Sequence, residues 1–142
     1  MASMDVEAVR EAYDEVRNDA SETSWVFLNY DDQTIKVAAQ GSEYSEFQNL
    51  FTDDERAFGF VRVVSGDEMS KRAKFVLITW CGNQVSPLKR ARMSTDKIEV
   101  KRVIKSFSIE LQVSDPEEVE LSCVMAQVQK AGGANYGTGA PN

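Results

Sequence analysis

Hydrophobic and polar residues alternate along the chain with two periods, one of three to four residues and one of two. The longer period over residues 4–18 predicts an amphipathic helix with acidic residues on its outer face. Its apolar face comprises Val6, Val9, Tyr13 and Val16. The aromatic run 25–30 is too short for a helix and predicts a strand, which the turn 31–33 connects to an alternating partner strand at 34–37.

The strongest strand signal lies in the middle of the chain. Residues 56–64 and 74–80 are apolar at successive positions, as expected for central strands whose two faces are both covered. The polar segment 65–72 between them predicts a long hairpin loop that projects beyond the sheet. Before this pair we expect a short helix at 44–51, with Ser42 as its N-cap.

Two cap-and-proline signals open the helices of the second half. Ser86-Pro87 predicts the start of a long helix, because serine accepts a hydrogen bond from the first turn and proline fits the first helical position. The inner face of this helix is expected to comprise Leu88, Ala91, Ile98, Val103, Ile104 and Phe107. Ser94-Thr95-Asp96 lies midway, where the side chains compete for backbone groups and favour a kink or a restart.

A last strand and a last helix complete the pattern. The strand is expected at 108–113, and Ser114-Asp115-Pro116 opens the helix. The buried stripe of this helix is expected to comprise Leu121, Val124, Met125 and Val128. We expect Gly132-Gly133 to end it and residues 134–142 to form a flexible tail. The order α-β-β-α-β-β-α-β-α predicts an α+β fold in three layers, α-β-α, with a central mixed sheet flanked by helices on both faces.

Composition narrows the function further. The 142 residues are the length of one domain. Histidine is absent, which removes the commonest general base and most catalytic zinc sites. Cys81 and Cys123 have neither metal-site nor disulfide-framework spacing, and no apolar run is long enough to span a membrane. We therefore expect a monomeric, non-enzymatic protein of the reducing cytoplasm, without catalytic residues, cofactor or metal.

Charge is distributed very unevenly along the chain. Ten of the sixteen basic residues lie in the window 71–105, which holds only two acidic residues and carries +8. Because the whole chain carries −7, the other 107 residues sum to −15. Such a split predicts one cationic face on an acidic protein and favours an anionic partner. We expect basic side chains from the hairpin, the long helix and the last helix to converge on that face.

Three basic groups provide the candidate contact residues. They are Lys71, Arg72 and Lys74 in the hairpin, Lys89, Arg92 and Lys97 in the long helix, and Lys130 in the last helix. Each group also has a purely structural interpretation, because lysines at a strand end discourage aggregation, charged helix faces are solvated, and Lys130 complements a helix dipole. For the long helix this interpretation is weaker, since like charges four residues apart, such as Lys97 and Lys101, cost about 0.2–0.5 kcal/mol each.

Several motifs resemble those of the coactosin family. Ser65-Gly66-Asp67, Ser70-Lys71-Arg72 and Lys74-Phe75 with Leu77-Ile78-Thr79-Trp80 resemble the coactosin strand pair. The segment 130–136, Lys-Ala-Gly-Gly-Ala-Asn-Tyr, is similar to the coactosin C-terminal signature. Further matches, which extend the resemblance over nearly all of residues 4–136, are Ala12-Tyr13, Val16-Arg17, Trp25 and Thr95-Asp96-Lys97.

This resemblance implies a single domain of actin-depolymerising-factor homology at residues 4–133. Residues 1–3, ahead of Met4, have the pattern of a vector-derived leader. Coactosins bind the sides of actin filaments, bind monomers poorly, do not sever, and interfere with capping at filament ends. Their filament binding depends on two lysines that fall on Lys74 and Lys130, and their long basic helix matches 88–105. We therefore expect actin filaments as the partner and a location in the cytoplasm, on the cytoskeleton.

Two alternatives remain open from the residues. A cofilin-like protein that severs filaments or binds monomers would present similar bases, and a peripheral protein could use them on anionic phosphoinositide lipids. Nucleic acid fits less well, because the charge of −15 elsewhere repels a polyanion and the basic window lacks interleaved exposed aromatic residues.

Overall fold

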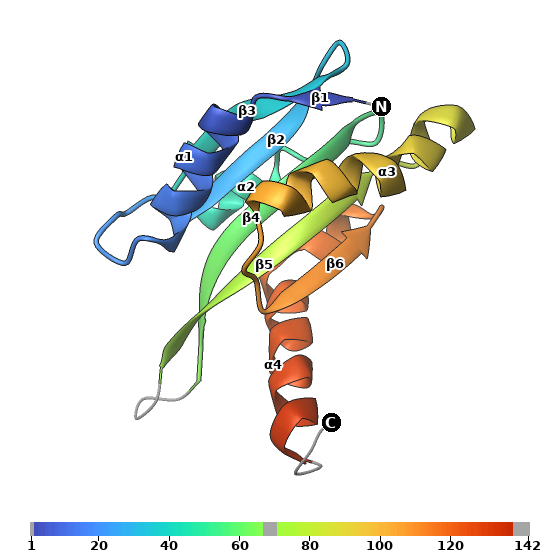
Figure 1. The fold of residues 1–142 in the computed structure, drawn as a ribbon. Coiled ribbons are helices and arrows are strands. Elements are labelled where there is room, and N and C mark those ends of the chain that lie inside the picture. The colour runs from blue at the N-terminus through green and yellow to red at the C-terminus, as the bar shows by residue number, and fades with distance from the viewer. Residues whose placement is uncertain (1, 67–70, 138–142) are drawn as a thin grey trace.

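One six-stranded mixed sheet organises the chain in the computed structural model, which describes residues 2–66 and 71–137, the last six of these by their backbone alone (Figure 1). The strands are β1 (Ser3–Met4), β2 (Trp25–Asp31), β3 (Thr34–Gly41), β4 (Arg56–Ser65), β5 (Arg72–Cys81) and β6 (Ile109–Val113). They lie in the order β1-β3-β2-β4-β5-β6, so the two strands with the strongest apolar signal are interior. The outer pairs β1–β3 and β5–β6 are parallel, and the inner pairs are antiparallel.

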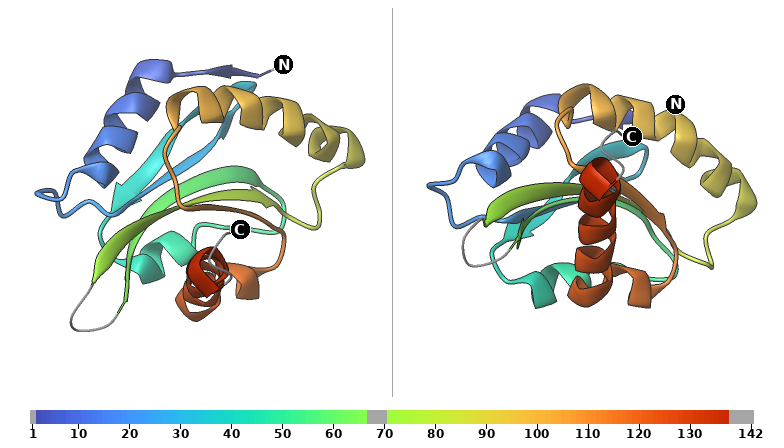
Figure 2. Two further views of the ribbon diagram at one scale, coloured as in Figure 1. Left: turned by 60° about the horizontal axis from the view of Figure 1, so that its bottom comes forward. Right: turned by 90° about the horizontal axis from the view of Figure 1, so that it is seen from below.

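Helices cover both faces of this sheet, as the sequence predicts (Figure 2). They are α1 (Val6–Arg17), α2 (Tyr44–Gln48), α3 (Pro87–Val103) and α4 (Leu121–Gly137), with a 3-10 turn η1 at Pro116–Val119. Helices α1 and α3 lie on one face, and α2 and α4 lie on the other. The three-layer α+β arrangement is therefore confirmed.

Alternation along the central strands supplies a separate core to each layer. On β4, Phe58 and Phe60 point to the α1/α3 side, whereas Val61 and Val63 point to the α2/α4 side. On β5, Leu77 faces α1 and α3, and the even-numbered residues from Val76 to Trp80 face α2 and α4. Both strands are thus buried on two sides, which explains their continuous apolar sequence.

Local chemistry sets several element boundaries. Ser86 caps α3 as predicted, its hydroxyl accepting a hydrogen bond from the Lys89 amide. The predicted N-cap Ser42 is wrong, because α2 begins after Glu43, whose side chain makes no capping bond. Helix α1 is capped by Asp5, and its buried stripe starts at Val9 because Val6 is exposed.

The phase of α3 differs from the prediction. Leu88 and Ile98, assigned to the inner face, are 64% and 53% exposed, and Ala91 is also exposed. The stripe that packs inward consists of Met93, Asp96, Val100 and Val103. The assignment failed because a carboxylate occupies this stripe, where a hydrophobic pattern expects an apolar residue. The helix also runs without interruption through Ser94–Asp96, so the predicted kink or restart is wrong.

Both ends of the chain depart from the expected boundaries. Ser3 and Met4 pair with Thr34 and Ile35, so residues next to Met1 join the edge of the sheet. Helix α4 continues to Gly137, and the prediction that Gly132-Gly133 ends it is wrong. Glycine lowers helix propensity by about 1 kcal/mol but does not forbid the conformation. Of the predicted tail 134–142, the first four residues are helical, and 138–142 lie outside the described residues.

Candidate functional site

The basic residues of the hairpin and those of α3 lie on opposite faces of the sheet. Along β5, Arg72 and Lys74 precede Val76 by four and two residues, so their side chains point to the same side of the strand as Val76. This is the side of α4, where Lys130 is exposed. Lys89, Arg92 and Lys97 belong to α3, on the other side. The expectation that all seven residues converge on one cationic face is therefore wrong, because the sheet separates them into two groups.

The hairpin group consists of Lys71, Arg72 and Lys74, with Lys130 on α4. Lys71, Arg72 and Lys130 are exposed and Lys74 is half-buried. Within residues 2–66 and 71–137, no carboxylate forms an ion pair with any of these four. Asp67 and Glu68, neighbours along the hairpin, lie outside the described residues. The four bases are thus available as a cationic surface on the described part of the molecule.

On α3, exposed bases and exposed apolar side chains occur along the same helix. Lys89 and Arg92 are exposed, and so are Leu88 and Ile98. A large exposed apolar side chain between charges is typical of the centre of a protein interface. Sequence reasoning missed Leu88 and Ile98 because it assigned them to the core, although the surrounding bases are the signal that could have placed them outside.

Lys97 differs from the other candidates because it is already paired. Its Nζ lies 2.9 Å from Oε2 of Glu110 on β6, and the Nζ of Lys101 lies 2.8 Å from Oε1 of the same carboxylate. The repulsion between the two like charges of α3 is therefore partly offset by one carboxylate that the sequence does not link to them. Burial raises the pKa of Glu110, but the hydrogen bonds from Lys101 and Lys97 outweigh burial and hold that pKa below its ordinary value.

Glu110→Gln gives a pH-dependent loss of stability. A carboxyl whose pKa is lower in the folded than in the unfolded state stabilises the fold above the unfolded value, near 4.5, and this contribution disappears as the pH falls through the folded pKa. We expect the variant to lose up to about 1 kcal/mol at pH 7 and to match the wild type at pH 2–3. Urea unfolding at a series of pH values measures the difference, and a cost that stays constant with pH would contradict the assignment.

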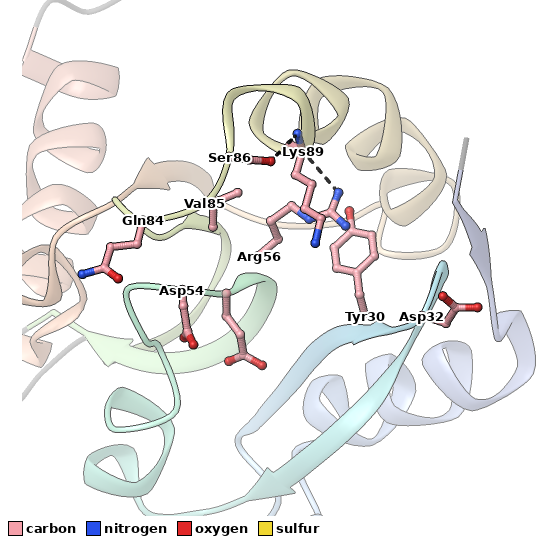
Figure 3. Close-up of a pocket in the computed structure, with 9 residues that line it drawn as sticks. Tyr30, Asp32, Asp54, Arg56, Gln84, Val85, Ser86 and Lys89 are labelled. Carbon is pink, nitrogen blue, oxygen red and sulfur yellow. Dashed lines mark hydrogen bonds between the residues drawn. The ribbon is translucent and has the colours of Figure 1, made fainter.

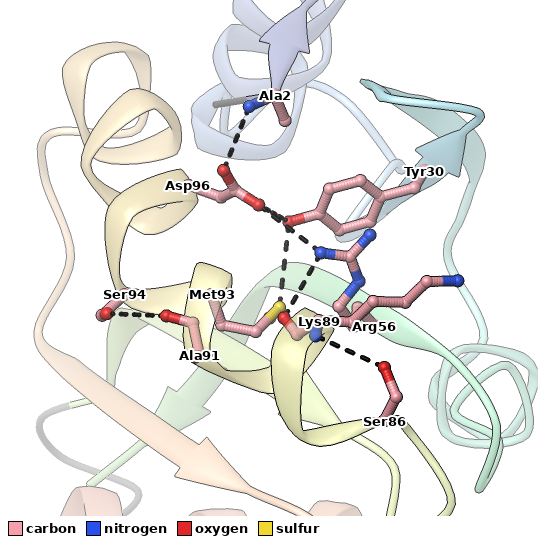
Figure 4. A network of polar contacts seen from close by, with 9 residues as sticks. All are labelled: Ala2, Tyr30, Arg56, Ser86, Lys89, Ala91, Met93, Ser94 and Asp96. Atoms are coloured by element: carbon pink, nitrogen blue, oxygen red, sulfur yellow. Dashed lines mark hydrogen bonds and ion pairs between the residues drawn. The ribbon is translucent and has the colours of Figure 1, made fainter.

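A buried polar network holds α3 against the sheet and the N-terminal segment (Figure 4). Its centre is Asp96, whose side chain is 2% exposed. One oxygen, Oδ1, accepts a hydrogen bond from the Ala2 amide at 3.2 Å. The other, Oδ2, accepts one from the Tyr30 hydroxyl at 2.6 Å and lies 3.7 Å from Nη1 of Arg56. Four segments distant in sequence thus meet at one carboxylate.

Arg56 extends this network to the first turn of α3. Its guanidinium stacks on the Tyr30 ring, 3.8 Å from the ring centroid, and donates to the Lys89 carbonyl at 3.4 Å. Burial, together with the hydrogen bond to Asp96, raises the pKa of Tyr30 far above 10, so the phenol remains a donor at all physiological pH values. The network therefore fixes both Lys89 and the third turn of α3, and with them the exposed face of that helix.

A polar groove of about 560 Å³ lies beside this network (Figure 3). It is lined by Tyr30, Asp32, Asp54, Glu55, Arg56, Gln84, Val85, Ser86 and Lys89. The carboxylates lie on the loops after β2 and before β4, and Lys89 faces them from α3. Across the described residues, no group of three or more His, Cys, Asp or Glu side chains is arranged to hold a metal ion. The described helices also include none that is long and apolar enough to cross a membrane.

Comparison with known proteins places this fold and these residues in one family. The model of the family "Cofilin/tropomyosin-type actin-binding protein" matches residues 1–129. The human coactosin-like protein is 50% identical over 133 residues, which is 94% of each chain. Its crystal structure superposes with a TM-score of 0.88 at 46% identity, covering 92% of this chain and 99% of the other.

A further solved structure is that of mouse coactosin, described as an actin filament binding protein. It matches with a TM-score of 0.78 at 46% identity and covers 99% of both chains. The family match and the relatives at about half identity agree with the fold and with the motifs of the hairpin and α4. The chain belongs to the cofilin/tropomyosin-type family of actin-binding proteins, among the coactosins.

Proposed function

We propose that this protein binds the sides of actin filaments through the hairpin and α4, and that it has no enzymatic activity. The observation that carries the proposal is the position of Lys74 and Lys130 on the same side of the sheet, without a carboxylate partner among the described residues. The hairpin extends beyond its neighbouring strands (Figure 1), where its bases meet a partner without steric obstruction. The mouse relative, an actin filament binding protein, supports the same partner.

The outer face of α3 supplies a second contact of a different kind. Leu88 and Ile98 are apolar and exposed, and Lys89 and Arg92 are exposed beside them. Because this face lies across the sheet from the hairpin, one planar surface cannot cover both. We infer that the protein presents two contact areas to two surfaces of the filament. An acidic filament matches both areas electrostatically.

The proposal also covers how the protein acts on the filaments that it binds. We propose that the protein does not sever filaments, that it opposes capping at barbed ends, and that it acts as a monomer on the cytoplasmic cytoskeleton. The rival function, severing or monomer binding as in cofilin, is tested by imaging labelled filaments and by titrating monomeric actin. Breakage of filaments, or tight binding to monomers, would favour the rival.

Lys74→Ala is expected to weaken binding to filaments at least tenfold, about 1.4 kcal/mol. The ammonium group of this half-buried lysine leaves water on binding and gains a charge-assisted contact to an acidic surface. Cosedimentation with filaments at 50–200 mM salt measures the effect, and wild-type binding should also fall with salt because exposed charges are screened over about 8–10 Å.

A matched control is Lys36→Ala, which removes a lysine that already pairs with Asp31 on the far edge of the sheet. We expect it to pellet like the wild type. Equal binding by Lys74→Ala and the wild type would contradict the assignment of Lys74. Flotation with phosphoinositide vesicles tests the lipid alternative, and salt-resistant binding that depends on the head group would support it.

A further inference from the structure

The β4–β5 hairpin leaves an open edge on β4. The pairing of β2 with β4 begins at Trp25, opposite Val61, and the next main-chain bond runs from the Arg62 amide to the Ser24 carbonyl at 2.7 Å. Beyond that point β4 continues through Val63, Val64 and Ser65, paired only with β5. Val64 is 58% exposed, and the pairing of β2 with β4 includes none of residues 63–65.

The direction of the main-chain groups on this edge follows from the strand geometry. Amides alternate sides along a strand, so the Val64 N–H and carbonyl point to the same side as the Arg62 N–H, away from β5. Val63 bonds toward β5, opposite Lys74. At Val64 the edge therefore offers one hydrogen-bond donor and one acceptor, on the side where a longer β2 would pair with β4. Such an edge is a template for another strand.

An apolar groove of about 280 Å³ runs along the same edge. Its lining includes Ser24, Ser42, Tyr44, Val63, Leu121 and Met125. The Tyr44 hydroxyl donates to the Val119 carbonyl at 2.7 Å, which fixes α2 against the segment before α4. Leu121 is 43% exposed. One side chain of an added strand would point into this groove, since alternate residues of a strand face the same side.

Charge along the edge is polarised. Toward the hairpin tip lie Lys71 and Arg72, the latter directly opposite Ser65. Toward the body of the sheet, exposed Glu43 and Glu120 flank the groove residues Ser42 and Leu121. An added strand antiparallel to β4 would begin at the tip and end at the sheet. Its N-terminal part would therefore meet bases, and its C-terminal part would meet acids.

We propose that the β4 edge at residues 62–65 binds an extended peptide of a partner protein as an added antiparallel strand. The peptide is acidic in its N-terminal half, has apolar residues in its middle, one of which enters the groove, and is basic or neutral at its C-terminal end. A second copy of this chain paired at the same edge is the alternative occupant, and a dimer on gel filtration in place of peptide binding would overturn the proposal. This contact differs from filament binding through Lys74 and Lys130, although the two share the hairpin bases Lys71 and Arg72.

The test uses two pools of fluorescein-labelled octapeptides. The first has Asp or Glu at positions one to three, Val, Leu, Ile or Phe at four to six, and Lys or Ser at seven and eight. The second has the same composition in reverse order. Fluorescence anisotropy with the full-length protein should show at least tenfold tighter binding of the first pool. Equal binding of both pools, or binding of neither, would overturn the proposal.

Val64→Pro tests the edge itself. Proline removes the amide that faces the open side and leaves the β5 ladder intact, so the fold should tolerate it. We expect loss of the first pool's binding in Val64→Pro and retention in the matched control Val64→Ala, which keeps the amide. Unchanged binding in Val64→Pro would overturn the proposal.

A second variant and a second readout keep the test independent. Leu121→Lys changes an exposed groove residue and should also abolish peptide binding without unfolding the protein. Filament binding is tested separately by cosedimentation of Lys74→Ala, because Val64 lies on the hairpin and Leu121 on α4, both of which the proposed filament surface uses. Failure of the peptide proposal therefore leaves filament binding intact, and failure of the filament proposal leaves the peptide result intact.

Discussion

Replacing Asp96 with alanine lowers the free energy of unfolding by about 3–5 kcal/mol. The side chain is 2% exposed, and its removal leaves the guanidinium of Arg56 without its counterion in a mostly buried position. The hydroxyl of Tyr30 and the amide of Ala2 lose their acceptor at the same time.

Urea unfolding followed by circular dichroism measures this loss. Asp31→Ala is the matched control, because it also removes an aspartate paired with a cation but at an exposed site, where we expect little loss of stability. A similar cost for both variants would show that burial of Asp96 contributes little. The network also positions Lys89 and the third turn of α3. We therefore expect the folded fraction of the Asp96 variant to bind filaments more weakly than the folded wild type.

Gly82→Ala is expected to cost about 3 kcal/mol or more, or to prevent folding. A Cβ at this position would overlap the main chain of Thr52 and Asp53. That main chain cannot move aside, because the Asp53 carbonyl accepts from the Gln84 amide and the Thr52 carbonyl accepts from the indole of Trp80. The steric conflict is with backbone rather than with an adaptable side chain.

Gly66→Ala separates this steric effect from backbone strain. Gly66 is exposed and has a φ of 107°, a conformation that alanine rarely adopts, so its cost should be about 1 kcal/mol. Thermal denaturation of both variants gives the comparison. If Gly82→Ala melted within a few degrees of the wild type, the close approach of the loop 52–53 to residue 82 would be in doubt.

Local patterns predicted most of the elements but not their contacts across the fold. The central strands follow from their uninterrupted apolar runs, and the start of α3 follows from Ser86-Pro87. Strand β1 could not be predicted, because two residues carry no period and their partners on β3, Thr34 and Ile35, lie 31 residues further along the chain. The phase of α3 was missed because the reason for burying Asp96 lies on β2 and β4.

The candidate site was likewise predicted only in part. The motifs around Lys74 and Lys130 were visible in the sequence, and the fold brings both to one side of the sheet. The charge count along the chain suggested one cationic face, but a count has no information about which layer a residue joins. For the same reason, the sequence does not predict the pairing of Lys97 and Lys101 with Glu110, which is a tertiary contact.

The buried carboxylate has a consequence for the rotational setting of α3. Leu88 and Ile98 on one side of that helix are as hydrophobic as Met93 and Val100 on the other. Hydrophobic packing alone would therefore allow α3 to rotate about its axis. Only one roll angle brings Asp96 to Tyr30, Arg56 and Ala2. An apolar residue in its place would leave Arg56 without its counterion and would also remove the contacts that select this rotation of α3, so the face that α3 presents to a partner would no longer be fixed.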